Sequence, residues 1–128
     1  MLVDHTYIAV VDDDEGLCRS LSRLLRAAGF QAVGYRSAED FLADDRRPQF
    51  DCLVLDISLP GISGLELHRQ LLSLKSMVPV IYQTAQEDAG LQMQAHAQGC
   101  AGYFGKTKAG PDLLAAIRRA VSVAHPLS

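Results

Sequence analysis

The chain has 128 residues, of which 48% are apolar and 21% charged, and its formal net charge is −3. These values are typical of one globular domain with its own core, and the negative charge and scattered basic residues argue against direct nucleic-acid binding. No uncharged apolar stretch approaches the roughly 20 residues of a membrane-spanning helix, and the N-terminus lacks the basic flank of a signal peptide. The three cysteines Cys18, Cys52 and Cys100 lie within or beside apolar segments, which predicts buried thiols in a reducing, cytoplasmic compartment.

The first elements alternate between strand and helix. The uncharged run YIAVV (7–11) predicts a strand covered on both faces. Apolar residues at helical spacing follow it as far as Gly29, a typical C-terminal stop. QAVGY (31–35) predicts a weaker second strand. Ser37 is expected to cap a short second helix, SAEDFLAD, with Asp40 three residues on as an approximate capping box.

The rest of the chain repeats this alternation. Three further strands are predicted at CLVLD (52–56), VPVIYQT (78–84) and AGYFGK (101–106). Three helices are predicted between and after these strands. Ser63 is expected to cap the third helix of the chain, and the fourth is expected from about Asp88 to Gln98. Pro111 fits the first turn of the last helix.

Strand–helix alternation at this spacing predicts an α/β fold, in which a doubly wound parallel sheet carries helices on both faces. Right-handed crossovers leave few topologies, and we expect the five-stranded, flavodoxin-like (βα)5 order 2-1-3-4-5. A single domain is expected over residues 1–128, with its core at about 5–122 and a tail at 123–128.

Polar residues stand at the carboxyl ends of four predicted strands, where ligands of such sheets bind. They are Asp12, Asp13 and Asp14 after the first strand, Asp56 at the end of the third, Thr84 at the end of the fourth and Lys106 at the end of the fifth. Adjacent carboxylates repel one another, so a hard divalent cation with oxygen ligands is expected, with Mg²⁺ as the natural candidate. Asp14 is expected instead to begin the first helix, where its charge suits the helix dipole.

The same constellation suits phosphoryl transfer. A carboxylate can accept a phosphoryl group as a covalent aspartyl-phosphate. The metal and the Lys106 ammonium would then neutralise charge on the transferring oxygens.

The motifs VVDDDE, LVLDISLPGISGLEL, PVIYQTA and GCAGYFGK occur in an order and spacing that resemble response-regulator receiver domains of two-component signalling. The stretch DDDEGLCRSLSRLLRAAGFQAVGYRSAEDFL resembles the subgroup attached to helix-turn-helix transcription factors of the nitrogen-fixation and quorum-sensing type. The resemblance implies a cytoplasmic signalling phosphoprotein, with at most self-catalysed phosphorylation and dephosphorylation, and not an enzyme.

The resemblance also implies roles for individual residues. Asp56 would be the phosphoacceptor. Asp13 would bind Mg²⁺ directly, Asp12 would act through water, and the backbone carbonyl of Ser58 would be a further ligand beside Asp56. Mn²⁺ would be accepted in place of Mg²⁺.

Three residues would respond to the phosphoryl group in such a domain. Thr84 would donate a hydrogen bond to it, Lys106 would pair with it, and Tyr103 stands at the family's switch-aromatic position. Ser58 and Gln86 stand where the family tunes the lifetime of its phosphate.

The partners implied are a sensor histidine kinase or phosphotransfer protein as donor and an output domain or partner protein as receiver of the signal. The output would contact the surface of the fourth helix, fifth strand and fifth helix. A phosphorylation-linked homodimer is a further implied assembly, and neither a nucleic acid nor a membrane is expected to bind this domain directly.

Two positions depart from the family pattern. Thr107 follows Lys106 where most receivers have proline, so a trans bond and an altered loop are expected there. Gln83 replaces an apolar residue before the strand-end threonine, and its amide must find partners or reach solvent.

Three alternatives remain at this stage. A degenerate receiver would keep the fold and bind partners without phosphorylation. A haloacid-dehalogenase-type phosphatase would also use an aspartyl-phosphate, but Gly16 stands where that family needs Thr or Val, and only Asp112 follows the lysine. A flavodoxin-like binding module would need a Gly-rich or Ser/Thr-rich phosphate cradle, which the first strand–helix loop lacks. The sequence leaves open whether the chain acts alone or is part of a longer regulator, and which kinase serves it.

Overall fold

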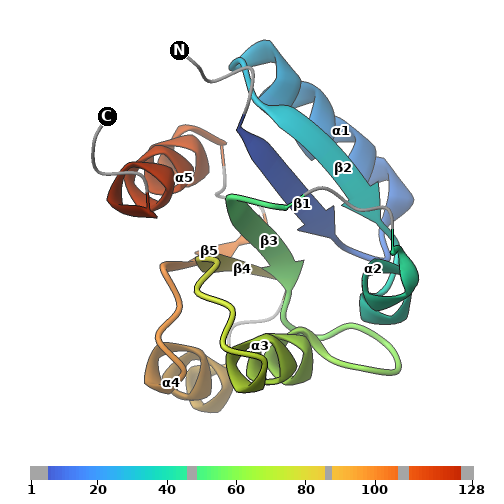
Figure 1. Cartoon of the computed structure of the whole chain (residues 1–128), viewed down its shortest axis with the longest axis vertical. Coiled ribbons are helices and arrows are strands. Elements are labelled where there is room, and N and C mark those ends of the chain that lie inside the picture. Colours follow the sequence, from blue (N-terminus) through green and yellow to red (C-terminus); the bar gives the residue numbers. More distant parts are fainter. Residues whose placement is uncertain (1–5, 46–48, 86–87, 107–109, 125–128) are drawn as a thin grey trace.

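The computed structural model of the chain describes residues 6–45, 49–85, 88–106 and 110–124, in which five strands alternate with five helices (Figure 1). The strands are β1 (Tyr7–Val11), β2 (Gln31–Tyr35), β3 (Cys52–Asp56), β4 (Val80–Thr84) and β5 (Gly102–Gly105). The helices are α1 (Glu15–Ala27), α2 (Ala38–Ala43), α3 (Gly64–Ser73), α4 (Ala89–Ala97) and α5 (Gly110–Ala124).

The strands form one parallel sheet in the order β2-β1-β3-β4-β5, which confirms the predicted topology. Its register aligns the carboxyl ends of the central strands. Val11 pairs with Leu55, Asp56 with Gln83, and Thr84 with Gly105. Residues that follow these strand ends therefore emerge side by side at one edge of the sheet.

Helices cover both faces of the sheet and enclose two apolar cores. One core joins the sheet to α1 and α5 through residues such as Leu25 and Ile117. The other joins it to α2, α3 and α4 through residues such as Phe41, Leu67 and Ala95. All residues of β3 and β4 are buried, as expected for strands covered on both sides.

Side-chain caps begin the first four helices where the sequence predicts them. The carboxylates of Asp14 and Asp88 and the hydroxyls of Ser37 and Ser63 each accept a hydrogen bond from a backbone N–H in the first turn. Such caps satisfy donors that the helix itself leaves unpaired. At the other end of α1, Gly29 has a φ of +98°, the left-handed conformation of a helix C-terminus.

Three strand boundaries differ from the prediction: the start of β4 and both ends of β5, which is one residue shorter at each end. β4 begins at Val80, two residues later than expected, because Pro79 has no N–H to donate and joins the sheet only through its carbonyl, which accepts from Leu53 N at 2.9 Å. β5 ends at Gly105, so Lys106 directly follows the strand.

The three cysteines carry free thiols, as the sequence predicts. Cys18 and Cys52 are buried and Cys100 is half-buried. No helix in the part of the chain that the structure describes is long and apolar enough to cross a bilayer. The predictions for Gln86 and Thr107 lie outside the described residues.

Candidate functional site

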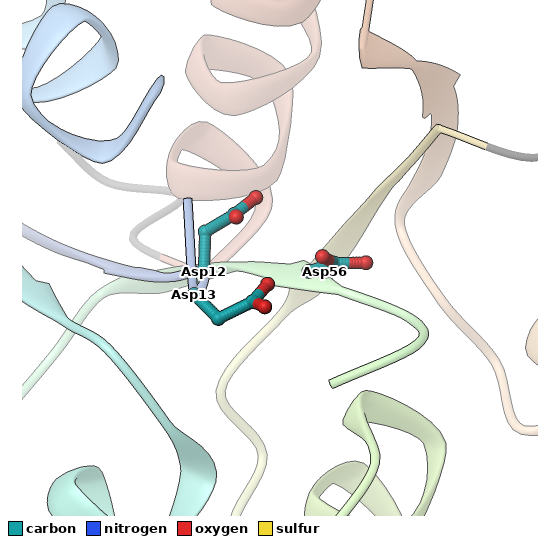
Figure 2. A group of neighbouring side chains, drawn as sticks. All are labelled: Asp12, Asp13 and Asp56. Atoms are coloured by element: carbon teal, nitrogen blue, oxygen red, sulfur yellow. The ribbon is translucent and has the colours of Figure 1, made fainter. Parts of the chain in front are cut away.

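Three carboxylates meet where β1 and β3 end (Figure 2). Asp12 and Asp13 come from the loop after β1, and Asp56 is the last residue of β3. One oxygen from each lies within 4.8 Å of the others. Asp12 is 1% exposed and Asp56 is 7% exposed, whereas Asp13 faces solvent. The site therefore has a buried floor and an open side.

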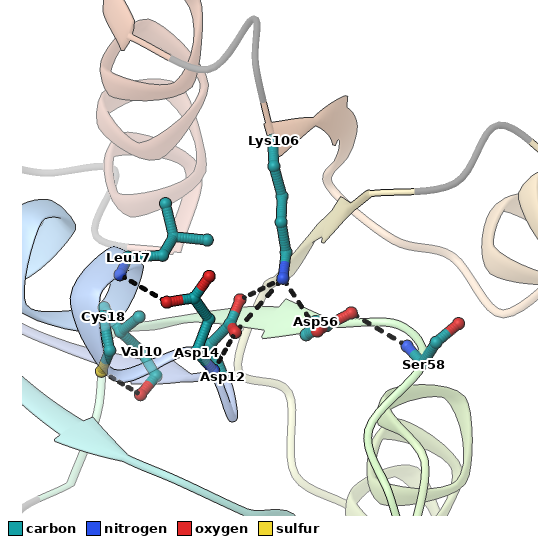
Figure 3. A network of polar contacts seen from close by, with 8 residues as sticks. All are labelled: Val10, Asp12, Asp14, Leu17, Cys18, Asp56, Ser58 and Lys106. Carbon is teal, nitrogen blue, oxygen red and sulfur yellow. Dashed lines mark hydrogen bonds and ion pairs between the residues drawn. The ribbon is translucent and has the colours of Figure 1, made fainter.

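Lys106 brings the compensating positive charge from the end of β5 (Figure 3). Its Nζ lies 3.0 Å from Asp12 Oδ2 and 3.0 Å from Asp56 Oδ2. Burial acts to lower the pKa of Lys106, but hydrogen bonds to both carboxylates outweigh it and raise the pKa above its usual value. The ammonium is therefore firmly charged and shared between the two acids.

Backbone N–H groups hold the two buried carboxylates in place. Asp56 Oδ1 accepts from Ser58 N at 3.0 Å, so each oxygen of Asp56 has its own donor, Ser58 on one side and Lys106 on the other. Asp12 Oδ1 accepts from Asp14 N at 2.8 Å. Asp14 itself points away from the site and caps α1 through Leu17 N at 3.0 Å, as predicted (Figure 3).

The charges at the site are not balanced within the described residues. Three carboxylates face one ammonium, and Asp12 Oδ2 is buried without a hydrogen bond, because Lys106 approaches it outside hydrogen-bonding geometry. Burial raises the pKa of Asp12 and the neighbouring Asp56 adds to the rise, against the opposing Asp14 N–H and Lys106. Such a donor set of hard oxygens with residual negative charge fits a divalent cation.

Thr84 and Tyr103 lie on neighbouring strands beside the acids. Thr84 ends β4 and is 3% exposed. Tyr103 lies on β5, and its ring centroid is 6.4 Å from that of Tyr82 and 6.1 Å from that of His96. Its hydroxyl oxygen is buried and makes no hydrogen bond to the described residues. Burial raises the pKa of Tyr103, with Asp88 and Cys100 adding to the rise, while the nearby Thr84 hydroxyl lowers it without reaching hydrogen-bonding geometry.

The structure brings together five of the predicted site residues: Asp12, Asp13, Asp56, Thr84 and Lys106 reach one end of the sheet from four strands. Ser58 is exposed in the loop after β3. Gln83 is 2% exposed, so the alternative in which its side chain reaches bulk solvent is wrong.

Sequence reasoning missed the role of Gly64 beside Asp56. A Cβ at position 64 would lie 2.3 Å from the Asp56 carbonyl oxygen, so only glycine lets α3 begin directly against the backbone of the acid. The sequence did offer a signal, because Gly64 lies in the first turn of a helix. Glycine lowers the stability of a helix, so its presence there indicates a close approach of the helix backbone to a neighbouring segment.

Comparisons with known proteins agree with this geometry. A family model described as the response regulator receiver domain matches residues 8–118. The response regulator protein TodT from Pseudomonas putida is 35% identical over 117 residues, which are 91% of this chain and 52% of that protein. The transcriptional regulatory protein FixJ from Bradyrhizobium diazoefficiens is 32% identical over 120 residues, which are 94% of this chain and 58% of that protein. The chain thus spans about half the length of the curated relatives it matches.

Solved structures show the same fold. The crystal structure of FixJ-N has a TM-score of 0.83 at 32% identity, covering 91% of this chain and 94% of that chain. The response regulator StyR has a TM-score of 0.84 at 35% identity, covering 92% of this chain and 60% of that chain. The family model and these relatives cover most of the chain, and the resemblance seen in the sequence is confirmed. The chain belongs to the response regulator receiver domain family.

Proposed function

We propose that this receiver domain accepts a phosphoryl group on Asp56 from a phosphohistidine of a sensor histidine kinase or phosphotransfer protein. The observation that carries the proposal is the setting of Asp56, a buried carboxylate with Lys106 at 3.0 Å and two further carboxylates within 4.8 Å. A helix cap or a solvated loop acid needs neither partner.

The residues fit a magnesium ion at the same place. Asp13, Asp56 and the backbone carbonyl of Ser58 would hold it, and Asp12 would act through water. Mg²⁺ prefers one or two carboxylates together with waters and a phosphate oxygen, and Mn²⁺ accepts similar ligands. When bound, the ion would neutralise charge on the transferring phosphoryl oxygens.

The transfer needs little covalent work from the protein. An Asp56 oxygen attacks the phosphorus in line with the donor, the new O–P bond forms as the donor N–P bond breaks, and the electron pair leaves on the imidazole nitrogen. Lys106 pairs with a phosphoryl oxygen, and the Thr84 hydroxyl donates a hydrogen bond to another. The bound group adds about −1.5 to −2 charge.

This added charge supplies the signal. Movement of Thr84 toward the phosphoryl group changes the space around Tyr103, which biases the surface formed by α4, β5 and α5 between two states. That surface would contact an output domain, a partner protein or, in a homodimer, a second copy of the chain. A single receiver domain over residues 1–128, a cytoplasmic location and a transcriptional output stay predictions.

The test is intact-mass analysis after incubation with acetyl phosphate, with and without Mg²⁺, beside Asp56→Asn. We expect the wild type to gain one phosphoryl group only with Mg²⁺ present and the variant to gain none. A gain that persists in Asp56→Asn would contradict the assignment of the acceptor. No gain together with no metal binding would favour a degenerate receiver, and sustained turnover of a phosphate ester would favour a phosphatase.

A further inference from the structure

The loop that joins β3 to α3 carries Ser58 and is held closed at its base. Gly64 N donates to Ile57 O at 3.2 Å, and Ser58 N donates to Asp56 Oδ1 at 3.0 Å. These two bonds connect the loop directly to the proposed phosphoacceptor. A displacement of the loop would therefore move Ser58 and release one oxygen of Asp56.

The tip of the same loop is held from α2. Glu39, in the first turn of α2, accepts a hydrogen bond through Oε2 from Ile62 N at 3.0 Å, across 23 residues of sequence. In Figure 1, α2 lies beside the loop that leaves β3. The contact is exposed, but it is a charge-assisted hydrogen bond to a backbone N–H, which is stronger than a neutral one.

Gly61 shapes the tip around this carboxylate. Its φ is +71°, and a Cβ built there would lie 2.3 Å from Glu39 Oε2. The left-handed turn and the missing side chain together let Glu39 reach Ile62 N. Glu39 on α2 and Gly61 in the loop therefore both contribute to the hydrogen bond with Ile62 N.

We propose that Glu39 is a positioning residue, which holds the β3–α3 loop so that the Ser58 carbonyl and the Asp56 carboxylate keep their places for the metal ion and the phosphoryl group. The inference rests on the proposed function and extends it to α2, which supplies no residue to the site itself. The competing role of Glu39 is a favourable charge at the N-terminus of α2. Asp40 shares that turn and that charge, which makes it the matched control.

The experiment measures Mn²⁺ affinity by electron paramagnetic resonance and the rate of phosphorylation by acetyl phosphate in four proteins: the wild type, Glu39→Ala, Glu39→Gln and Asp40→Ala. We expect Glu39→Ala to weaken Mn²⁺ binding and slow phosphorylation about three- to tenfold, the range of one lost hydrogen bond. Glu39→Gln keeps an oxygen that accepts from Ile62 N and should restore both values to within about twofold of the wild type. Asp40→Ala should also leave both values unchanged.

Gly61→Ala supplies a second, independent perturbation of the same contact. Alone it should weaken Mn²⁺ binding at least as much as Glu39→Ala, because an alanine at a φ of +71° is also strained in its backbone. The two changes together should be less than additive, because both remove the same hydrogen bond.

Wild-type Mn²⁺ affinity in Glu39→Ala, or equal losses in Glu39→Ala and Glu39→Gln, would overturn the positioning role. If the wild type binds Mn²⁺ but accepts no phosphoryl group, the proposed function fails while the affinities of the variants still decide the role of Glu39. If the wild type does neither, both proposals fall.

Discussion

At the scale of single residues, Asp12 carries the most deeply buried charge of the site. It is 1% exposed, and burial raises the pKa of its carboxyl above the ordinary value of 3.8. A group whose pKa is raised on folding contributes stability below its unfolded pKa and loses that contribution as the pH rises through the folded value. At neutral pH without metal, the ionised Asp12 therefore disfavours the folded state.

Asp12→Asn should for this reason raise the melting temperature at pH 7 in the absence of divalent metal, by about 2–5 °C for a domain of this size. The gain should shrink as the pH falls through the raised pKa of the folded state, where the buried carboxyl takes up a proton, and should be lost below the ordinary value of 3.8. Thermal unfolding monitored by circular dichroism across this pH range measures the effect.

Asp14→Asn is the control for that measurement. Asp14 is exposed, and asparagine also caps helices well, so the melting temperature of this variant should equal that of the wild type. A lower melting temperature for Asp12→Asn at pH 7 would show instead that the ion pair with Lys106 outweighs the cost of burying the acid.

The individual elements show what the sequence was able to predict. Caps such as Asp14 and Ser63 are local signals, and each begins its helix where it was expected. The acids also converged as predicted, because the carboxyl ends of parallel strands share one edge and the register aligns Val11 with Leu55. These inferences needed only periodicity and topology.

Contacts between distant segments were beyond such reasoning. The bond from Ile62 N to Glu39 depends on how α2 packs against a loop, and nothing in the period of either segment encodes it. The burial of the Tyr103 hydroxyl likewise depends on which rotamer fits between its neighbours, and the start of β4 depends on the pairing of Pro79 with β3.

A polar network connects α3, β4 and the end of α4. Tyr82 OH on β4 lies 2.8 Å from His68 Nδ1 on α3. Gln98 Nε2, at the end of α4, donates to Tyr82 OH at 3.4 Å and to Leu65 O at 3.3 Å. Burial lowers the pKa of His68 and raises that of Tyr82, so both are neutral at pH 7. The network ties α3 and α4 to the central sheet.

Tyr82→Phe should destabilise the protein by about 1–3 kcal/mol, because it leaves the buried ring nitrogen of His68 without its partner. The double variant His68→Leu with Tyr82→Phe should recover much of that loss, since replacing both polar groups by apolar ones removes the unpaired group. Urea unfolding at pH 7 measures both.

The pH dependence of this network has a definite sign. The folded pKa of His68 lies below its unfolded value near 6.5, so its contribution to stability is present above that value and is lost as the pH falls through the folded pKa. The double variant should lose less stability than the wild type over this range. Equal pH profiles, or no recovery in the double variant, would contradict the proposed role of the pair.

At the scale of the whole molecule, one sheet carries both the proposed phosphoryl site and the aromatic residue that would report its state. Lys106 directly follows β5, and Tyr103 lies on the same strand three residues earlier. Its ring contacts Tyr82 and His96, and its hydroxyl is buried. A buried hydroxyl without a hydrogen bond is unfavourable, so it weakens the preference of the ring for this position.

Tyr103→Ala should therefore separate phosphorylation from its consequence. The ring contacts neither Asp56 nor Lys106 in the described interactions, so the mass gain with acetyl phosphate should match the wild type. The response of α4 and β5, measured as phosphorylation-dependent changes in amide hydrogen exchange, should be strongly reduced. Tyr103→Phe keeps the ring but removes the unsatisfied hydroxyl, so it should retain the phosphorylation-dependent exchange response that Tyr103→Ala loses. Loss of phosphorylation in Tyr103→Ala, or an unchanged exchange response, would show that Tyr103 is not the link between the acid site and the surface.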